Sequence, residues 1–294
     1  MDNSVDRSQP EVWDSVWRGT ELTPIAVRRK FDRESKTLRW KAIRDSLCAQ
    51  FGSLKGLRTI ELGAGTGDIS LLLASEGAVP TLLDANDRAL TIARLQFEVM
   101  NFPANFITGD FFDLDPSLLG QFDAAVSYGV VEHFRGVDRI LACKSHAKVL
   151  RPGGMVAISV PNAHCLPYRL NKWREEVTGK WVWGLEIPYT RKELGEVARE
   201  MGLESWFIHG SSFLRDWDQF LLTGQSLLVF IQVGRSSRVS ARILVRRFAS
   251  RSRRRRLSAF GRERRNISST YCVASKESMR PSMPMRRGVA EVLG

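Results

Sequence analysis

A short apolar run leads into three closely spaced glycines in the segment Thr59-Ile60-Glu61-Leu62-Gly63-Ala64-Gly65-Thr66-Gly67-Asp68. The run Arg58–Leu62 predicts a buried strand, and Ile69–Ser75 continues as a helix. Glycine adopts backbone angles that other residues avoid, and it lets a ligand approach the main chain without a Cβ in the way. The segment therefore predicts a tight strand-to-helix turn that can hold a ligand.

The spacing of these glycines is GxGxG, which differs from the GxGxxG of dinucleotide-binding turns. Asp68 stands where that fingerprint has its third glycine. A carboxylate at the start of a helix repels a pyrophosphate, whereas it tolerates a cationic sulfonium and its amino group. The turn therefore disfavours an NAD-dependent oxidoreductase and favours a sulfonium cofactor.

The chain around this turn alternates apolar runs with helical patterns, which implies a parallel sheet covered on both faces. We expect Arg151–Gly154 to be a turn and Ser205–Ile208 to pair with Leu227–Val233 as a closing hairpin. The fold class is α/β, with a doubly wound, mostly parallel, seven-stranded sheet in one domain. Further strands are expected at Val79–Asp84, Asn105–Thr108, Phe122–Tyr128 and Met155–Val160, and further helices after a cap at Asn86 or Asp87, at Ile140–Leu150 and at Arg191–Met201.

Acidic residues follow two of the predicted strands. Asp84 lies 21 positions after Gly63, where a carboxylate in a doubly wound sheet can accept hydrogen bonds from both ribose hydroxyls. The alternative is a cap for the following helix. Asp110 and Phe111 suit an adenine, because a carboxylate can accept from its amino group while an aromatic ring packs on its face. The alternative there is an ordinary turn at the end of a strand.

At this point the chain resembles the class I S-adenosylmethionine-dependent methyltransferase superfamily, and most of all its small-molecule branch, which includes the ubiquinone and menaquinone biosynthesis enzymes. The resemblance is good over Leu57–Val160 and weaker as far as Val233. Its elements occur in the expected order, namely Glu61–Gly67, Asp84, Gly109–Phe111, Tyr128–Phe134 and Val149–Gly154.

The resemblance implies S-adenosylmethionine as the cofactor and assigns a part of it to each element. The glycine turn would hold the methionine part, Asp84 the ribose, and Asp110 with Phe111 the adenine. Residues Ser127–Val130 would line the floor near the sulfonium. The candidate cofactor-binding residues are Glu61, Gly63, Ala64, Gly65, Gly67, Asp84, Asp110, Phe111, Ser127 and Tyr128.

Methyl transfer is an in-line displacement that depends mainly on positioning, and a general base is needed only for some acceptors. His133 is the candidate base, because it follows a strand at the edge of the sheet where ligands bind, and Glu132 beside it is a candidate orienting group. The alternative is that the pair caps or packs the next segment. His164 is a second candidate, with an ordinary loop residue as its alternative.

Two segments occupy the places where this family carries its variable substrate cap. They are the helix-like residues 1–55 and the insertion 162–186, which is rich in aromatic and basic residues and shows no clear period. Tryptophans over a site suit an apolar or planar acceptor, although they equally suit a small cap with its own core. The candidate substrate residues are Trp17, His164, Tyr168, Trp181 and Trp183.

The net charge of +12 is a property of the tail. Residues Arg235–Arg265 contain thirteen arginines and one glutamate, whereas Met1–Gly234 is close to neutral. Such a tail can neutralise an anionic membrane surface or the phosphates of a nucleic acid, or it can be a disordered, solvated extension without a partner. We expect domains at 1–55, 56–234 and 235–294.

The N-terminal sequence, the lengths of the apolar runs and the cysteines limit the class of protein to which the chain can belong. The opening Met1–Glu21 is polar and has no apolar h-region, and no stretch reaches the ~18 apolar residues that span a bilayer. We therefore expect a cytoplasmic protein, with peripheral contact at a membrane surface through the tail as a further role. Four scattered cysteines without a CxxC pair predict neither a metal site nor a disulfide framework: Cys48, Cys143, Cys165 and Cys272.

The function predicted from the sequence is methyl transfer from S-adenosylmethionine to a small organic acceptor. One alternative is an RNA- or protein-directed methyltransferase recruited by the basic tail, but the floor Ser127–Val130 lacks the Asn/Asp-Pro-Pro-aromatic motif of enzymes that methylate base amino groups. A second alternative is a regulatory protein that binds the cofactor without catalysis.

Overall fold

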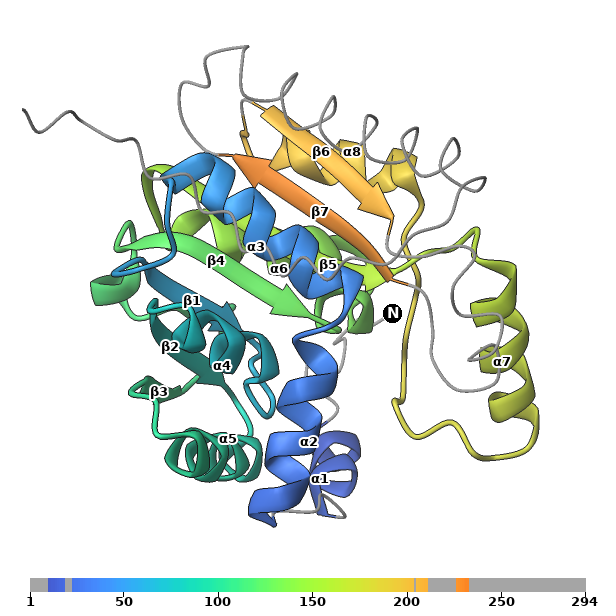
Figure 1. Cartoon of the computed structure of the whole chain (residues 1–294). Helices are drawn as coiled ribbons and strands as arrows, with labels where there is room; N and C mark the ends of the chain where they lie inside the picture. The colour runs from blue at the N-terminus through green and yellow to red at the C-terminus, as the bar shows by residue number, and fades with distance from the viewer. Residues whose placement is uncertain (1–9, 19–22, 204, 211–225, 233–294) are drawn as a thin grey trace, which may run out of the picture.

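The computed structural model describes residues 10–18, 23–203, 205–210 and 226–232 of the chain (Figure 1). The predicted tail Arg235–Arg265 lies outside these ranges. No helix within them combines the length and the apolar character that crossing a bilayer requires. The helices are α1 (Pro10–Arg18), α2 (Pro24–Glu34), α3 (Leu38–Phe51), α4 (Asp68–Ser75), α5 (Asp87–Met100), α6 (Gly136–Lys148), α7 (Leu166–Val177) and α8 (Arg191–Glu200), with short 3-10 turns η1 (Pro116–Leu118) and η2 (Val131–His133).

Seven strands form one sheet in the order β3-β2-β1-β4-β5-β7-β6. The first five are parallel, β7 pairs antiparallel with β5, and β6 pairs antiparallel with β7. The predicted seven-stranded, mostly parallel sheet and its closing hairpin are therefore confirmed. The strands are β1 (Arg58–Leu62), β2 (Val79–Asp84), β3 (Asn105–Thr108), β4 (Phe122–Tyr128), β5 (Leu150–Pro161), β6 (Ser205–Gly210) and β7 (Ser226–Gln232).

Helices cover both faces of the sheet, and its central strands β1, β2 and β4 are buried on both sides. On one face, α6 and α8 pack against β1, β4 and β5. On the other, α3, α4 and α5 pack against β2, β4 and β5. Buried Ile43 and Leu47 of α3 join this core, so α3 is a helix of the layer rather than a cap. The interpretation of residues 1–55 as a cap can hold only for α1 and α2.

The bounds predicted for the helix, turn and strand between Ile140 and Val160 were wrong. The helix expected at Ile140–Leu150 is α6, which begins at Gly136 and ends at Lys148. Leu150 instead starts β5, where it pairs with Phe122 before the register shifts. Pairing with β4 resumes at Met155, opposite Ala124, so the predicted turn Arg151–Gly154 is an irregularity within the continuous strand β5.

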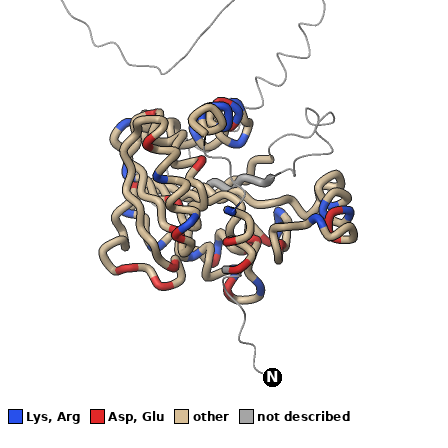
Figure 2. The backbone as a smooth tube through the Cα atoms, turned by 90° about the horizontal axis from the view of Figure 1, so that it is seen from below, with Lys and Arg blue, Asp and Glu red and all other residues tan. Residues whose placement is uncertain are grey.

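The insertion 162–186 contains a helix that its sequence did not indicate. This is α7, and its apolar residues Leu166, Leu170, Trp173 and Val177 do recur at helical spacing. It stands out from the rest of the described chain in two views at right angles, on the right in Figures 1 and 2.

Candidate functional site

The glycine turn lies at the carboxyl end of β1, between that strand and α4. Gly63, Gly65 and Gly67 all have positive φ, at 66°, 54° and 73°. A Cβ at Gly67 would lie 2.3 Å from Leu82 Cδ2, and one at Gly63 would lie 2.8 Å from Val130 Cγ1. The turn is therefore a bare main-chain cradle that side chains at these positions would strain or fill.

Asp84 at the end of β2 holds this cradle in place. Its Oδ2 accepts the Gly65 N–H at 2.7 Å, and its Oδ1 accepts the Asn86 N–H at 2.8 Å. Burial raises the pKa of Asp84, and the two amide donors oppose that shift. The cap of α5 is Asn86, whose side chain accepts from Ala89, so the alternative of Asp84 as the cap itself does not apply. Its carboxylate keeps further lone pairs for the hydroxyls of a sugar.

Glu61 is bonded to the following helix, and its predicted contact with the cofactor stays a prediction. It is buried, and its Oε2 accepts from both the amide (3.0 Å) and the hydroxyl (2.6 Å) of Ser70. Burial raises the pKa of Glu61 to about 8. These contacts join β1 to α4, so Glu61 fixes the angle at which α4 leaves the glycine turn.

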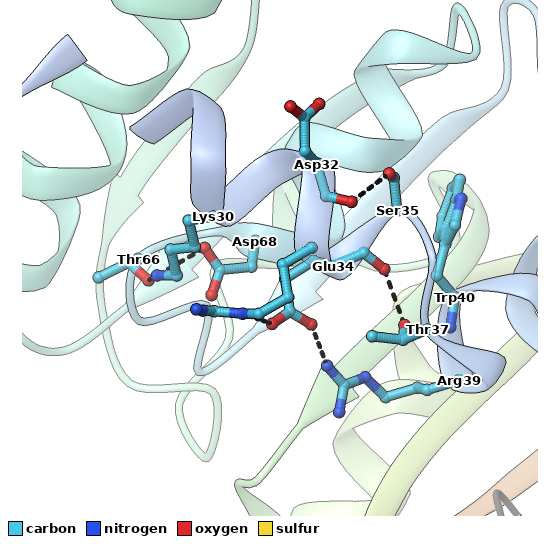
Figure 3. Close-up of polar contacts among 10 residues, drawn as sticks. Lys30, Asp32, Glu34, Ser35, Thr37, Arg39, Trp40, Thr66 and Asp68 are labelled. Carbon is cyan, nitrogen blue, oxygen red and sulfur yellow. Dashed lines mark hydrogen bonds and ion pairs between the residues drawn. The ribbon is translucent and has the colours of Figure 1, made fainter. Parts of the chain in front are cut away.

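Asp68 does not present a bare negative charge to the turn. Lys30 of α2 pairs with its carboxylate at 2.8 Å and also donates to the Thr66 hydroxyl at 3.0 Å (Figure 3). The charge that the sequence sets against a pyrophosphate is thus balanced by a residue 38 positions earlier. The case against a dinucleotide then depends on the glycine spacing alone.

The floor at the end of β4 carries a cation that the sequence did not reveal. Arg39 of α3 lies with its guanidinium carbon 3.6 Å from the centroid of the Tyr128 ring. One of its terminal nitrogens bonds Glu34 at 2.7 Å (Figure 3), while its buried Nε has no hydrogen-bond partner among the described residues. The buried hydroxyl of Ser127 likewise has no partner there. Both unpaired groups suit a polar ligand on this floor.

The two residues predicted to bind adenine make contacts that are common at strand ends and in protein cores. Asp110 is exposed, and its side chain accepts from the Phe112 amide at 2.8 Å, as in a strand-end turn. Phe111 is buried in the core, stacked on Phe112 and edge-on to Phe134. These contacts match the alternative reading of both residues. An adenine-binding role for them stays a prediction.

A second cluster lies beyond the end of β4, around η2. Glu132, His133 and Glu186 each offer one atom within 4.8 Å of the others, a grouping that could hold a metal ion. The Tyr168 hydroxyl donates a hydrogen bond to Glu186. Burial and the neighbouring Glu186 raise the pKa of Glu132 to about 8, and its Oε2 has no hydrogen-bond partner in the described chain.

His133 is held by the main chain of the segment that carries Glu186. Its Nδ1 lies 2.5 Å from the Leu185 carbonyl oxygen, so Nδ1 carries the proton and Nε2 keeps its lone pair. Burial lowers the pKa of His133 to about 4, although the carbonyls of Leu185 and Gly129 favour the charged form. The backbone carbonyl of Glu132 accepts from Ile187 at 2.8 Å. Glu132 and His133 therefore both contact the segment after α7, which agrees with the alternative role of packing the next segment. The imidazole of His133 nevertheless stays neutral.

Helix α1 connects the two clusters. The Asp14 carboxylate accepts from the Asn86 side chain at 2.7 Å, next to Asp84. A Cβ on Gly65 would lie 3.2 Å from the indole of Trp17. The Trp13 ring stands edge-on to His133, with 4.8 Å between centroids. One short helix thus covers the glycine turn at one end and the imidazole at the other.

The segment that carries the glycine turn is similar in sequence to known methyltransferases. Residues 60–154 match the model of a methyltransferase domain. This part of the chain is therefore similar to methyltransferase domains. It is 30% identical over 151 residues to a ubiquinone biosynthesis O-methyltransferase of Sinorhizobium fredii, covering 48% of this chain and 58% of that protein. Over 130 residues it is 30% identical to the enzyme of that name from Rhizobium etli, covering 41% and 50%. The chain thus spans about half the length of these relatives.

Solved structures show the same fold for the methyltransferase domain. Magnesium protoporphyrin IX methyltransferase from Synechocystis PCC 6803, with bound SAH, matches with a TM-score of 0.53 at 16% identity. The match covers 76% of this chain and 94% of that one.

The structure brings only some of the predicted substrate residues together. Trp183 has its ring centroid 6.4 Å from that of Trp13, near His133. Trp181 donates to the Gly184 carbonyl at 2.8 Å, and His164 is exposed on the turn before α7. The described contacts join neither Trp181 nor His164 to His133.

Four residues around the domain's two clusters escaped the sequence analysis as site residues, namely Trp13, Lys30, Arg39 and Glu186. Each comes from a segment that lies far from the recognised motifs in the chain, and each is an ordinary surface-type or aromatic residue in its local pattern. Their positions depend on how α1, α2, α3 and the loop after α7 pack.

Proposed function

We propose that this chain transfers the methyl group of S-adenosylmethionine to a small organic acceptor. The observation that carries the proposal is the glycine cradle at the end of β1, tied through Gly65 to the carboxylate of Asp84 on the neighbouring strand. The cradle offers main chain without side chains, the carboxylate offers acceptors for a ribose, and the guanidinium of Arg39 offers a donor for the methionine carboxylate. The residues present therefore fit this cofactor.

When bound, the cofactor supplies an activated methyl group and its own leaving group. The chain has to align the acceptor with that methyl group and exclude water, which can lower the barrier by several kcal/mol. Helix α1 is suited to both tasks, because Trp17 lies over the glycine turn and Trp13 lies against His133. Trp13 and Trp183 offer apolar walls on the acceptor side, and Tyr168 offers a polar group there through Glu186.

His133 is the proposed base for an acceptor that must lose a proton. Its ring is neutral at physiological pH, its tautomer is fixed by Leu185, and Nε2 has a lone pair to accept the proton. Glu132 does not orient the imidazole by a hydrogen bond that the structure records. We propose instead that it helps to hold the segment that carries Leu185 and Glu186, because its carbonyl accepts from Ile187.

Two measurements test the function. Calorimetry with S-adenosylhomocysteine tests the cofactor site without any acceptor, and conversion of S-adenosylmethionine with pooled candidate acceptors tests turnover. A folded protein without measurable affinity for either compound would exclude the proposal. Affinity without turnover on any pool would favour a regulatory protein that binds the cofactor.

The base is tested by His133→Ala, which should lose turnover while its affinity for S-adenosylhomocysteine stays nearly unchanged. His164→Ala is the comparison, because that side chain is exposed before α7 and was the second candidate. Equal loss of affinity in His133→Ala would show a structural role for the imidazole, and loss of turnover in His164→Ala alone would move the role of base to that residue.

Recruitment of the methyltransferase to RNA or protein by its tail is the less favoured function, because the relatives are small-molecule enzymes by name. The cytoplasmic location and the binding of an anionic partner by Arg235–Arg265 stay predictions. Truncation after Gly234 should leave turnover of a soluble acceptor intact if the tail acts only as an electrostatic anchor.

A further inference from the structure

Arg139 of α6 is a buried cation outside the proposed cofactor and acceptor clusters. It is only 6% exposed, and each nitrogen of its guanidinium has a partner. Nε bonds Glu193 of α8 at 2.6 Å, Nη1 donates to the Ile187 carbonyl at 2.8 Å, and Nη2 donates to the Pro188 carbonyl at 3.2 Å. The guanidinium carbon lies 3.3 Å from the centroid of the Tyr189 ring. An ion pair between α6 and α8 would need only the first of these contacts, so the others are directed at the segment after α7.

The returning segment, residues 185–189, contacts the 3-10 turn η2 through every second residue. The contacts join the Leu185 carbonyl to His133 Nδ1 (2.5 Å), the Ile187 N–H to the Glu132 carbonyl (2.8 Å), and the Tyr189 hydroxyl to the Val131 carbonyl (3.3 Å). Tyr189 is also tied to the end of β5, because its N–H donates to Pro161 at 2.9 Å and its carbonyl accepts from Ala163 at 2.9 Å. The sheet therefore fixes the segment at Tyr189, four residues away from the carbonyl that holds His133.

Arg139 holds the middle of the returning segment. Its two bonds fix the carbonyls of Ile187 and Pro188, and the proline restricts Ile187 to extended backbone. The Leu185 carbonyl is only two residues from the nearer of these bonds, so a shift at Ile187 is carried to it. The described contacts of Arg139 do not include His133, so its effect on the imidazole passes through the segment.

We propose that Arg139 is a positioning residue for the base. Its bonds to the Ile187 and Pro188 carbonyls set the place of the Leu185 carbonyl, which keeps the proton of His133 on Nδ1 and leaves Nε2 to accept a proton from the acceptor. The role of the base rests on the proposed function. The tautomer of the imidazole can be measured without any acceptor, so the two can fail separately.

The tautomer is measured by long-range nitrogen–proton correlation spectra of the full chain, in which a protonated and a bare ring nitrogen give separate signals. The chain has four histidines, and His133→Ala identifies the signals of His133 by their loss. The test variant is Arg139→Lys, since a lysine keeps the charge but not the planar fork that reaches both carbonyls. The matched control is Lys144→Gln, because Lys144 also joins α6 to α8, through an ion pair with Glu200 at 3.2 Å.

A second control separates the ion pair of Arg139 from its carbonyl contacts. Glu193→Gln removes the charge that meets Nε, while a glutamine can still cap α8 as the glutamate does. The carbonyls of Ile187 and Pro188 stay in place in this variant. Thermal unfolding and calorimetry with S-adenosylhomocysteine show whether each variant is folded, and Arg139→Gln replaces Arg139→Lys if the latter unfolds.

We expect His133 to carry its proton on Nδ1 in the native chain, in Lys144→Gln and in Glu193→Gln, and to show a mixture of tautomers in Arg139→Lys. Turnover on any acceptor pool that the native chain converts should fall by up to about 100-fold in Arg139→Lys, while the affinity for S-adenosylhomocysteine stays within about twofold. If the native chain converts no pool, the proposed function fails, and the tautomers still decide the role of Arg139.

A native tautomer in folded Arg139→Lys would overturn the proposal, as would a native chain that lacks the proton on Nδ1. The same mixture of tautomers in Lys144→Gln or Glu193→Gln would also overturn it, since the effect would then belong to the contact between α6 and α8. Unfolding of both Arg139 variants, or a parallel loss of affinity for S-adenosylhomocysteine, would leave Arg139 a role in stability alone.

Discussion

Replacing Asp84 by asparagine tests the proposed cofactor site at the point where β1 and β2 meet. Both carboxylate oxygens accept main-chain N–H groups, one from Gly65 and one from Asn86. An asparagine has one oxygen, so its amide group would face one of these donors, and the negative charge would be lost. Losing a hydrogen bond to a charged group costs about 1.5–3 kcal/mol. We expect Asp84→Asn to lower the melting temperature by about 3–12 °C for a domain of this size.

The same substitution should weaken cofactor binding more than a general loosening would. The amide cannot accept from both ribose hydroxyls, so the affinity for S-adenosylhomocysteine should fall about 10- to 100-fold. Calorimetry measures the affinity and circular dichroism the melting temperature, with Asp32→Asn as the control, because the side chain of Asp32 is exposed on α2. A lower melting temperature with native affinity would refute the ribose assignment and leave Asp84 only the role of holding the turn.

Gly67→Ala should be more destabilising than Gly179→Ala by at least about 1 kcal/mol in chemical unfolding, because both have positive φ but only a Cβ at Gly67 meets Leu82, at 2.3 Å. Equal losses would show that the turn relaxes freely. Arg39→Gln should lower the affinity for S-adenosylhomocysteine about tenfold in calorimetry, because a charge-assisted contact is lost. Arg33→Gln is the control and should leave the affinity unchanged, because the Arg33 side chain is 71% exposed. An unchanged affinity in Arg39→Gln would remove that residue from the site. The raised pKa values of Glu61 and Glu132, both about 8, mean that the folded state keeps protons that the unfolded state has released. The free energy of unfolding should therefore fall as the pH rises from about 6.5 to 8. Below that range, the lowered pKa values of His133 and His146 act in the opposite direction. In Glu132→Gln, the stability measured by thermal unfolding should fall less steeply between these pH values. The same dependence on pH as in the native chain would contradict the raised pKa of Glu132.

The centre of the sheet was predictable because β1, β2 and β4 are buried along almost their whole length and are rich in apolar residues. Strands β1, β2, β3 and β4 have the bounds expected from the sequence. One bound that failed lies at Leu150, where an apolar residue suits a helix end and a strand start equally well. The structure decides for the strand through the pairing of Leu150 with Phe122. Local pattern alone cannot make that choice, because it depends on a neighbour in space.

The glycine turn was predictable for a related reason. Its function is local, since a strand, three glycines and a helix within ten residues define the cradle, and a doubly wound sheet places the end of β2 beside it. Asp84 follows from that topology. Lys30 and Arg39 do not, because they reach the turn and the floor from helices that precede the first strand. A lysine and an arginine in such helices look like ordinary solvated residues.

The proposed acceptor side shows most clearly which contacts the sequence could not predict. Trp13 of α1, His133 of η2 and Trp183 of the loop after α7 lie within ring-contact distance, although they come from three separate parts of the chain. The ring of His133 depends on a carbonyl 52 residues away. A site of this kind has no spacing to recognise, since its geometry arises only when the segments pack. The proposed cofactor side is therefore predictable from a motif. The proposed acceptor side depends on tertiary contacts, which can change from one chain to the next without any change in the glycine turn.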